Sequence, residues 1–100
     1  MVFGCISSSP RGTLSPQQVL NLAKIYLDNA CKTNDPDIAM VLCHDTEVSL
    51  THAKKNVKHT RNQSLTEGIA GAYIDLGKLL ESRGHFNGAQ ANFKKAEKLG

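Results

Sequence analysis

Four histidines are the side chains of this sequence best suited to metal binding or to proton transfer near neutral pH: His44, His52, His59 and His85. A metal site on one helix prefers histidines at positions i and i+4, with a third ligand close by. His52 and His59 are seven residues apart, and Cys43 is directly followed by His44, so neither pair has this spacing. We therefore expect solvent-exposed or helix-end histidines and no metal site.

The three cysteines are Cys5, Cys31 and Cys43, an odd set without a CxxC pair, which a disulfide framework seldom shows. This usage is typical of a reducing compartment, and we expect a cytoplasmic protein in which Cys31 and Cys43 are small core residues. A cysteine nucleophile would need a positioned base and a cleft, and the sequence indicates neither. It also contains no glycine-rich phosphate loop and no GxSxG motif. We predict no catalytic residues, no enzymatic activity and no cofactor.

Length and composition limit which partners the protein can have. One hundred residues make one domain at most, and 40% apolar residues are enough for a folded core. Twelve Lys and Arg against nine Asp and Glu leave a net charge of +3, which is too small to demand a nucleic acid or an anionic membrane as partner. No apolar run approaches the ~18–20 residues that span a bilayer. We expect another protein as the partner, and neither nucleic acid nor a membrane.

The first 14 residues differ in character from the rest. Their apolar part ends at Ile6, which is too short for a secretory signal peptide, and the Ser-rich stretch that follows offers little to bury. We predict a flexible N-terminal leader over residues 1–14 and one helical domain over residues 15–100.

Helix-start signals divide this domain into four helices. Ser15 is followed by Pro16 and, three residues after the serine, by Gln18, which is the pattern of a capping box. Asp35 precedes a proline in the same way directly after the first helix, so a tight helical hairpin is expected. The second helix is predicted to end near His59. Its predicted buried stripe comprises Ile38, Leu42, Thr46, Leu50, Ala53 and Val57.

The second half of the domain repeats this arrangement. Ser64 with Glu67 forms another capping box, and Gly84 marks the end of the third helix as a left-handed C-cap residue. The third helix places five large apolar residues on one face: Leu65, Ile69, Tyr73, Leu76 and Leu80. The fourth helix carries four apolar residues on one face: Phe86, Ala89, Phe93 and Ala96. No segment alternates as a strand would, so we predict an all-α fold of four helices in two antiparallel hairpins.

Large and small side chains follow a fixed order in the second hairpin, AYIDLGKLLESRGHFNGAQANFKKAEKLG. Tyr73 is followed by the pair Leu76-Gly77, and two helices cross closely only where side chains as small as Gly77, Ala89 and Ala96 meet. Over residues 70–100 this order resembles a tetratricopeptide (TPR) repeat. The other positions that match the repeat are Leu80, Gly84, Phe86 and Phe93.

The first hairpin, residues 15–60, resembles the same repeat more loosely. The matches pair Leu22, Ala23 and Tyr26 with Leu76, Gly77 and Leu80, and Ala39 and Cys43 with Ala89 and Phe93. Ala23 precedes Gly77 by 54 residues, whereas the ordinary repeat spans 34. The resemblance therefore implies two stacked TPR-like hairpins, the first with an extended second helix.

The resemblance also implies a concave surface, formed by the first helix of each hairpin, on which a peptide or a helix of a partner protein docks. Six residues are the candidates for partner binding there: Leu20, Lys24, Leu27, Ile74, Lys78 and Glu81. Leu20 and Leu27 are seven residues apart and form a candidate partner-facing apolar strip; the alternative is that both are buried against the third helix. We therefore predict a non-catalytic interaction module, an adaptor or scaffold.

A second surface lies on the second helix, away from its predicted buried stripe. Val41, Val48 and His52 fall on one side of this helix, and we do not expect both valines on a fully solvated face. Either the long helix is buried on two sides by its neighbours, or these residues mediate self-association, as a homodimer or as part of a larger scaffold. Self-association is the alternative function.

Basic residues gather near the end of the second helix: Lys54, Lys55, Lys58 and Arg61. Cations at this end complement the helix dipole. A phosphate or nucleic-acid site is a further alternative, although no aromatic side chain alternates with these cations as in proteins that bind single strands.

Overall fold

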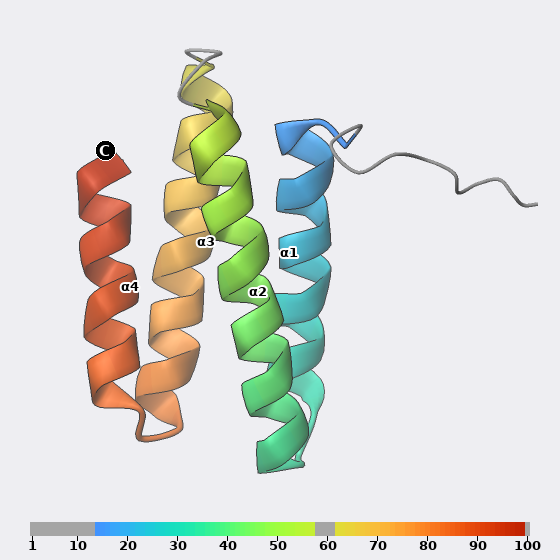
Figure 1. Cartoon of the computed structure of the whole chain (residues 1–100). Coiled ribbons are helices and arrows are strands. Elements are labelled where there is room, and N and C mark those ends of the chain that lie inside the picture. The colour runs from blue at the N-terminus through green and yellow to red at the C-terminus, as the bar shows by residue number, and fades with distance from the viewer. Residues whose placement is uncertain (1–13, 58–61, 100) are drawn as a thin grey trace, which may run out of the picture.

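The computed structural model describes residues 14–57 and 62–99, and in these segments it contains four α-helices and no β-strand (Figure 1). The helices are α1 (Pro16–Lys32), α2 (Pro36–Val57), α3 (Gln63–Ser82) and α4 (Phe86–Leu99). The predicted all-α fold is confirmed. Among the described residues, no helix combines the length and the apolarity that a membrane crossing needs.

Several predictions concern residues outside the described segments. These residues are the leader up to residue 13, which includes Cys5, and the basic or histidine positions Lys58, His59 and Arg61.

The predicted starts of α1 and α2 are confirmed. The Ser15 hydroxyl accepts a hydrogen bond from the Gln18 backbone N–H at 3.2 Å, and the Gln18 side-chain oxygen accepts one from the Ser15 N–H at 2.8 Å, which completes the capping box. At the start of α2, a carboxylate oxygen of Asp35 accepts hydrogen bonds from the N–H groups of Asp37 and Ile38. The short connection between these helices turns the chain back, so α1 and α2 are antiparallel (Figure 1).

The start of α3 differs from the prediction. Its cap is Asn62, whose side-chain oxygen accepts a hydrogen bond from the Leu65 N–H at 3.0 Å, and the predicted cap at Ser64 is wrong. Asparagine caps a helix as well as serine does, so the chain forms the longer helix that Asn62 allows.

The end of α3 is formed as predicted. Gly84 has a φ of 87°, a left-handed conformation that glycine adopts without steric cost. The Gly84 N–H donates to the carbonyl of Glu81 at 3.1 Å, and the His85 N–H donates to the carbonyl of Leu80 at 2.8 Å. This is the Schellman arrangement, and it directs α4 back along α3.

The two hairpins, α1–α2 and α3–α4, are joined through α3. This helix contacts both α1 and α2 and also forms the hairpin with α4. In Figure 1, α1 and α3 run in one direction, and α2 and α4 run in the other. The position of α3 therefore determines how the second hairpin lies against the first.

The buried faces follow the predictions on α3, and on α2 they do so at Thr46, Leu50, Ala53 and Val57. On α3, all five predicted residues are buried. On α2, Ile38 is exposed and Leu42 is half-buried, whereas Ala39 and Cys43 are buried. The prediction for Ile38 is wrong, because a close helix pair buries small side chains along its contact line and leaves larger ones at the edge.

Cys31 and Phe86 are two further corrections. Cys31 is exposed, because the buried side of α1 is formed by residues such as Leu27 and Ala30, and Cys31 lies at its edge. Phe86 is exposed as well, because it is the first residue of α4 and stands beside the turn at Gly84, where no helix surface faces it. Cys43 is buried as predicted.

Gly77 sets the separation of α3 and α4. A Cβ atom added to Gly77 would lie 2.5 Å from a ring carbon of Phe93, well inside van der Waals contact. Ala89 and Ala96 are buried on the side of α4 that faces α3. The predicted role of small residues at this crossing is therefore confirmed.

We expect Gly77→Ala to lower the free energy of unfolding by about 1–3 kcal/mol, because the added methyl group displaces the Phe93 ring. Gly71→Ala is the matched control in the same helix. No atom lies within 4 Å of its Cβ position, so this substitution should raise the free energy of unfolding by about 0.5–1 kcal/mol. Chemical denaturation followed by circular dichroism measures both. Equal effects at the two glycines would contradict the role assigned to Gly77.

Candidate functional site

A groove of about 510 Å³ runs between α1 and α3. Its lining residues are Lys24, Leu27, Asp28 and Cys31 from α1, and Ala72, Asp75, Lys78 and Leu79 from α3. Leu27 and Ala72 are buried and Leu79 is half-buried, so they form an apolar floor. The four charged side chains are exposed and form the rim.

The helical repeat explains why these residues lie together. Positions three, four and seven apart fall on one side of a helix, and both sets have this spacing. Because α1 and α3 run in the same direction, one contact near their starts is enough to align the two sets. A Cβ atom added to Gly68 would lie 2.9 Å from the Leu20 side chain, so α3 approaches α1 closely at this level.

Arg83 fixes the other ends of α1 and α3 to each other. Its Nη2 atom donates hydrogen bonds to the backbone carbonyl oxygens of Ala30 and Thr33, each at 3.0 Å. These carbonyls belong to the last turn and the cap of α1, where the helix dipole favours a cation. The groove therefore has walls whose separation is fixed at both ends.

The charged rim of the groove is only partly paired. Lys24, Asp75 and Lys78 form no ion pair or side-chain hydrogen bond within the described residues. Asp28 pairs with Lys32 at 2.9 Å, and this hydrogen bond, together with the charge of the carboxylate, raises the pKa of Lys32. The groove thus offers two free cations and one free carboxylate around its apolar floor.

Three of the six predicted partner-binding residues line the groove: Lys24, Leu27 and Lys78. Leu20 is only 2% exposed and packs against Gly68, so the interpretation of Leu20 and Leu27 as an exposed apolar strip is wrong. Burial against the third helix was the alternative, and it occurs because Gly68 leaves room for the Leu20 side chain. Leu27 is 7% exposed and contributes to the floor of the groove.

Ile74 and Glu81 are exposed on α3 but do not line the groove. Ile74 borders a separate hollow of about 340 Å³ instead, together with Phe93, Ala96 and Glu97.

The six predicted residues omit five that line the groove: Asp28, Cys31, Ala72, Asp75 and Leu79. A signal for the first two was present, because Asp28 and Cys31 continue the spacing of Lys24 and Leu27 by one turn. Asp75 likewise precedes the predicted Lys78 by three residues. Ala72 and Leu79 could not be found in this way, because they depend on which side of α3 faces α1.

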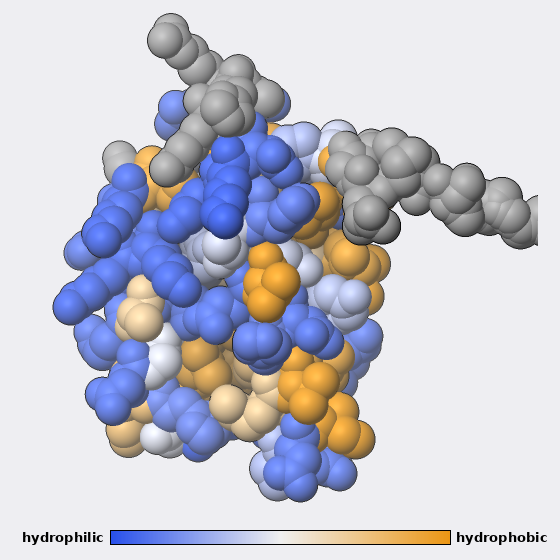
Figure 2. Space-filling model, viewed as in Figure 1, coloured by the Kyte–Doolittle hydropathy of each residue, from blue (hydrophilic) through white to orange (hydrophobic). Residues whose placement is uncertain are grey.

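The predicted self-association residues Val41, Val48 and His52 are all exposed, so the described part of the chain does not bury α2 on two sides. Val48 and His52 line a hollow of about 220 Å³ between α1 and α2, together with Leu14 and Leu22. Val41 does not line it. Figure 2 shows apolar surface along this α1–α2 side of the molecule, whereas the α4 side is mostly hydrophilic in the same view.

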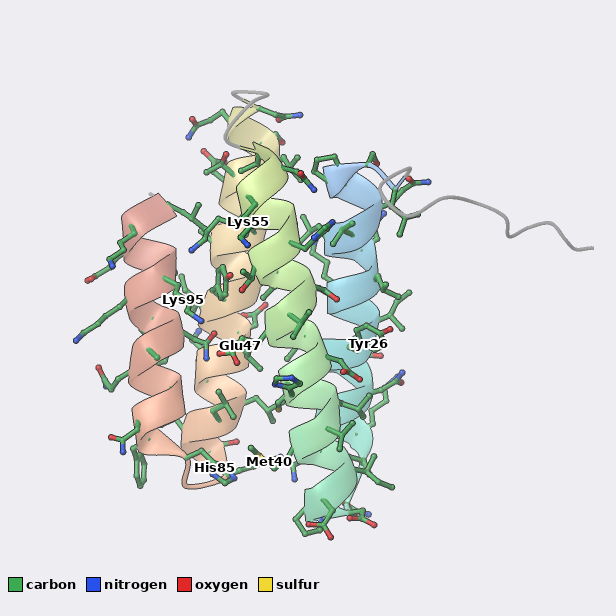
Figure 3. The ribbon with its side chains drawn as sticks, in the orientation of Figure 1. Tyr26, Met40, Glu47, Lys55, His85 and Lys95 are labelled. Atoms are coloured by element: carbon green, nitrogen blue, oxygen red, sulfur yellow. The ribbon has the colours of Figure 1, made fainter. Side chains whose placement is uncertain are left out.

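A polar cluster connects α4 to the first hairpin. Lys95 and Glu47 form an ion pair at 3.4 Å, and they lie toward each other from α4 and α2 in Figure 3. The Asn92 amide donates hydrogen bonds to Glu47 at 3.4 Å and to the Gly88 carbonyl at 2.8 Å. The Lys95 ammonium also lies 5.8 Å from the centre of the Tyr73 ring. These contacts hold the second hairpin in register with the first.

Within residues 14–57 and 62–99, no three His, Cys, Asp or Glu side chains lie close enough together to hold a metal ion. Comparison of the chain with models of protein families, with curated proteins and with solved structures gives no significant match.

We expect Arg83→Met to lower the free energy of unfolding by about 1.5–3 kcal/mol, because two carbonyls at the end of α1 lose a charged donor. Lys98→Met is the control, since Lys98 is exposed in the last turn of α4 and should change stability by less than about 0.5 kcal/mol. Urea denaturation of both variants gives the comparison. A loss as small for Arg83→Met as for Lys98→Met would show that Arg83 does not hold the groove walls.

Cys43 and Cys31 should differ in reactivity. Burial raises the pKa of the Cys43 thiol, and the nearby Arg83 charge acts in the opposite direction with a smaller effect. Folding thus keeps this thiol protonated at a pH where an unfolded cysteine ionises. The stability that Cys43 contributes is therefore complete below about pH 8.5, the pKa of an unfolded cysteine, and decreases as the pH rises above it.

In a Cys5→Ser background, we expect iodoacetamide to alkylate Cys31 in the folded protein and Cys43 only after unfolding, as measured by mass spectrometry. We also expect the difference in free energy of unfolding between this background and its Cys43→Ala derivative to shrink between about pH 7 and about pH 9.5. Rapid alkylation of Cys43 under native conditions would contradict its burial.

Proposed function

We propose that this protein is a non-catalytic interaction module of the TPR-like type, which binds a peptide or a helix of a partner protein in the groove between α1 and α3. One observation carries the proposal: an apolar floor is surrounded by charged side chains that have no partner within the described residues. These side chains are Lys24, Asp75 and Lys78. A ligand with an apolar side chain and flanking charges satisfies both parts of such a surface.

The arrangement of the helices supports the TPR-like interpretation. The first helices of the two hairpins are neighbours and run in the same direction, and the groove lies between them (Figure 1). Close packing of α3 on α4 occurs at Gly77, which belongs to the Leu-Gly pair that carries the resemblance. These are the features that the resemblance implies for a peptide-binding pair of hairpins.

The length of the groove indicates the size of the ligand. Lys24 and Cys31 are seven residues apart, which is about 10 Å along a helix. This distance matches about two turns of a bound helix or about three residues of an extended peptide. The ligand is therefore a short segment that inserts one or two apolar side chains, with charges placed to meet the two lysines and Asp75.

The test is a selection of random displayed peptides against the folded chain, followed by fluorescence anisotropy with the selected peptides. We expect Lys24→Glu/Lys78→Glu to weaken binding by about tenfold or more, because each substitution replaces an attraction by a repulsion. Lys94→Glu/Lys98→Glu is the matched control, with the same change of net charge at two exposed positions of α4. It should leave the affinity within about twofold.

Equal losses in the two double variants would assign the effect to net charge and would contradict the groove as the binding site. An independent readout comes from a nitroxide attached to Cys31, which lines the groove and is exposed. In a Cys5→Ser background, the nitroxide should broaden the NMR signals of the bound peptide. Sharp peptide signals at saturation would place the ligand elsewhere.

A further inference from the structure

The two hairpins can be aligned on the residue pairs that carry their resemblance to one repeat. Positions in α1 correspond to positions 54 residues later in α3, as in the pair Ala23 and Gly77. Positions in α2 correspond to positions 50 residues later in α4, as in the pair Ala39 and Ala89. All four of these residues are buried, so the correspondence holds where each hairpin packs on itself. Where two other corresponding residues differ in burial, one hairpin is covered by a neighbour at that position and the other is not.

The first hairpin has a side that the second hairpin covers. Four residues form it: Leu20, Cys43, Thr46 and Glu47. Leu20 packs against Gly68, and Glu47 is bonded to Asn92 and Lys95. Leu20, Cys43 and Thr46 are all buried.

The corresponding side of the second hairpin is uncovered in the described structure. We call it the open face, and its residues are Ile74, Phe93, Ala96 and Glu97. These four residues together line the hollow of about 340 Å³ between α3 and α4. Ala96 is buried and Phe93 is half-buried, because both pack on α3. Ile74 is 38% exposed, whereas its counterpart Leu20 is 2% exposed, and Glu97 is exposed as well. The corresponding surface on the first hairpin is the one on which the second hairpin packs.

The residues by which α3 and α4 cover the first hairpin also have counterparts. Gly68 packs against Leu20, Ala72 lines the groove with α1, and Leu76 and Leu80 line a hollow of about 300 Å³ with Cys43. Ala72, Leu76, Leu80 and Asn92 are all buried. The counterparts of these four buried residues on the first hairpin form what we call the packing face: Gln18, Leu22, Tyr26 and Leu42.

No residue of the packing face is buried, although three of its four side chains are apolar or aromatic. Leu14 and Leu22 line the hollow of about 220 Å³ between α1 and α2, next to Val48 and His52. Among residues 14–57 and 62–99, nothing covers the packing face or the open face.

We propose that the packing face of one copy of this chain binds the open face of a second copy, in the arrangement by which the second hairpin packs on the first within the chain. The contact is head-to-tail, so it leaves a free open face and a free packing face at the two ends of a pair. Further copies add in the same way, in contrast to a closed symmetric dimer. Val41 takes no part, because its counterpart, Ala91, is exposed on α4.

One charge pair makes the contact between copies weaker than the contact within the chain. Within the chain, Lys95 pairs with Glu47. Their counterparts in the contact between copies are Asp45 and Glu97, which repel each other. Asp45→Lys therefore restores the missing pair and should strengthen the association. A substitution that only disturbs folding would not strengthen it, so this variant tests the contact itself.

Sedimentation equilibrium of the full chain, from about 1 µM to about 500 µM, tests the proposal. We expect the weight-average mass of the wild type to rise with concentration beyond that of a dimer. Asp45→Lys should shift the rise to concentrations about tenfold lower, which corresponds to about 1.4 kcal/mol. Ile74→Asp places a charge on the open face and should abolish the rise. Circular dichroism verifies that each variant is folded.

Val41→Asp is the matched control for Ile74→Asp, since it places the same charge on an exposed apolar residue outside both faces, and it should leave association unchanged. A wild type that stays monomeric throughout the range would overturn the proposal. A symmetric dimer through α2 would give a different result: Val41→Asp would abolish association and Asp45→Lys would leave it unchanged. That result would also overturn the proposal. Ile74 does not line the groove between α1 and α3, so Ile74→Asp should leave peptide binding there unchanged. Failure of peptide binding is therefore distinguishable from failure of this proposal.

Discussion

α3 has to lie close to α1 and to α4 at the same time, and it does so at two positions without a side chain. Gly68 receives Leu20 of α1, and Gly77 receives the ring of Phe93 of α4, each at a distance that a Cβ atom would not permit. Larger residues at either position would push a neighbouring helix away. The groove depends on the first of these contacts, because α1 and α3 can share a floor only when they are neighbours, and Arg83 then holds their other ends together.

Local signals in the sequence predict the helices well, because each depends on a few adjacent residues. The capping box at Ser15, the cap at Asp35 and the left-handed turn at Gly84 are all formed. Apart from the cap of α3, which is Asn62 and not Ser64, the errors occur where the outcome depends on a neighbour that is distant in sequence. Periodicity shows that α1 and α2 each have an apolar side, but Leu20 is buried and Ile38 is exposed because of where α3 and α1 lie. No local pattern specifies that arrangement.

The candidate site was predictable only in part, for the same reason. Lys24, Leu27 and Lys78 follow from the resemblance together with helical spacing, and the structure brings them to one groove. Ile74 is on the same helix as Lys78 but belongs to a different surface, because it directly precedes the groove residue Asp75 and is turned about 100° from it around α3. The register of α3 against α1 is fixed by Arg83, whose partners lie 50 or more residues earlier in the chain.

The proposed association and the proposed binding groove are linked through the same correspondence. When a second copy packs on the open face, its α1 lies beside α3 of the first copy, and a new groove forms between these two helices. Lys78 then takes the place that Lys24 has in the groove within the chain, but Glu81 takes the place of Leu27. A carboxylate in the floor does not favour the apolar side chain that Leu27 accommodates. Assembly would therefore create binding surfaces of a second, more polar kind, and the grooves within and between copies would select different ligands.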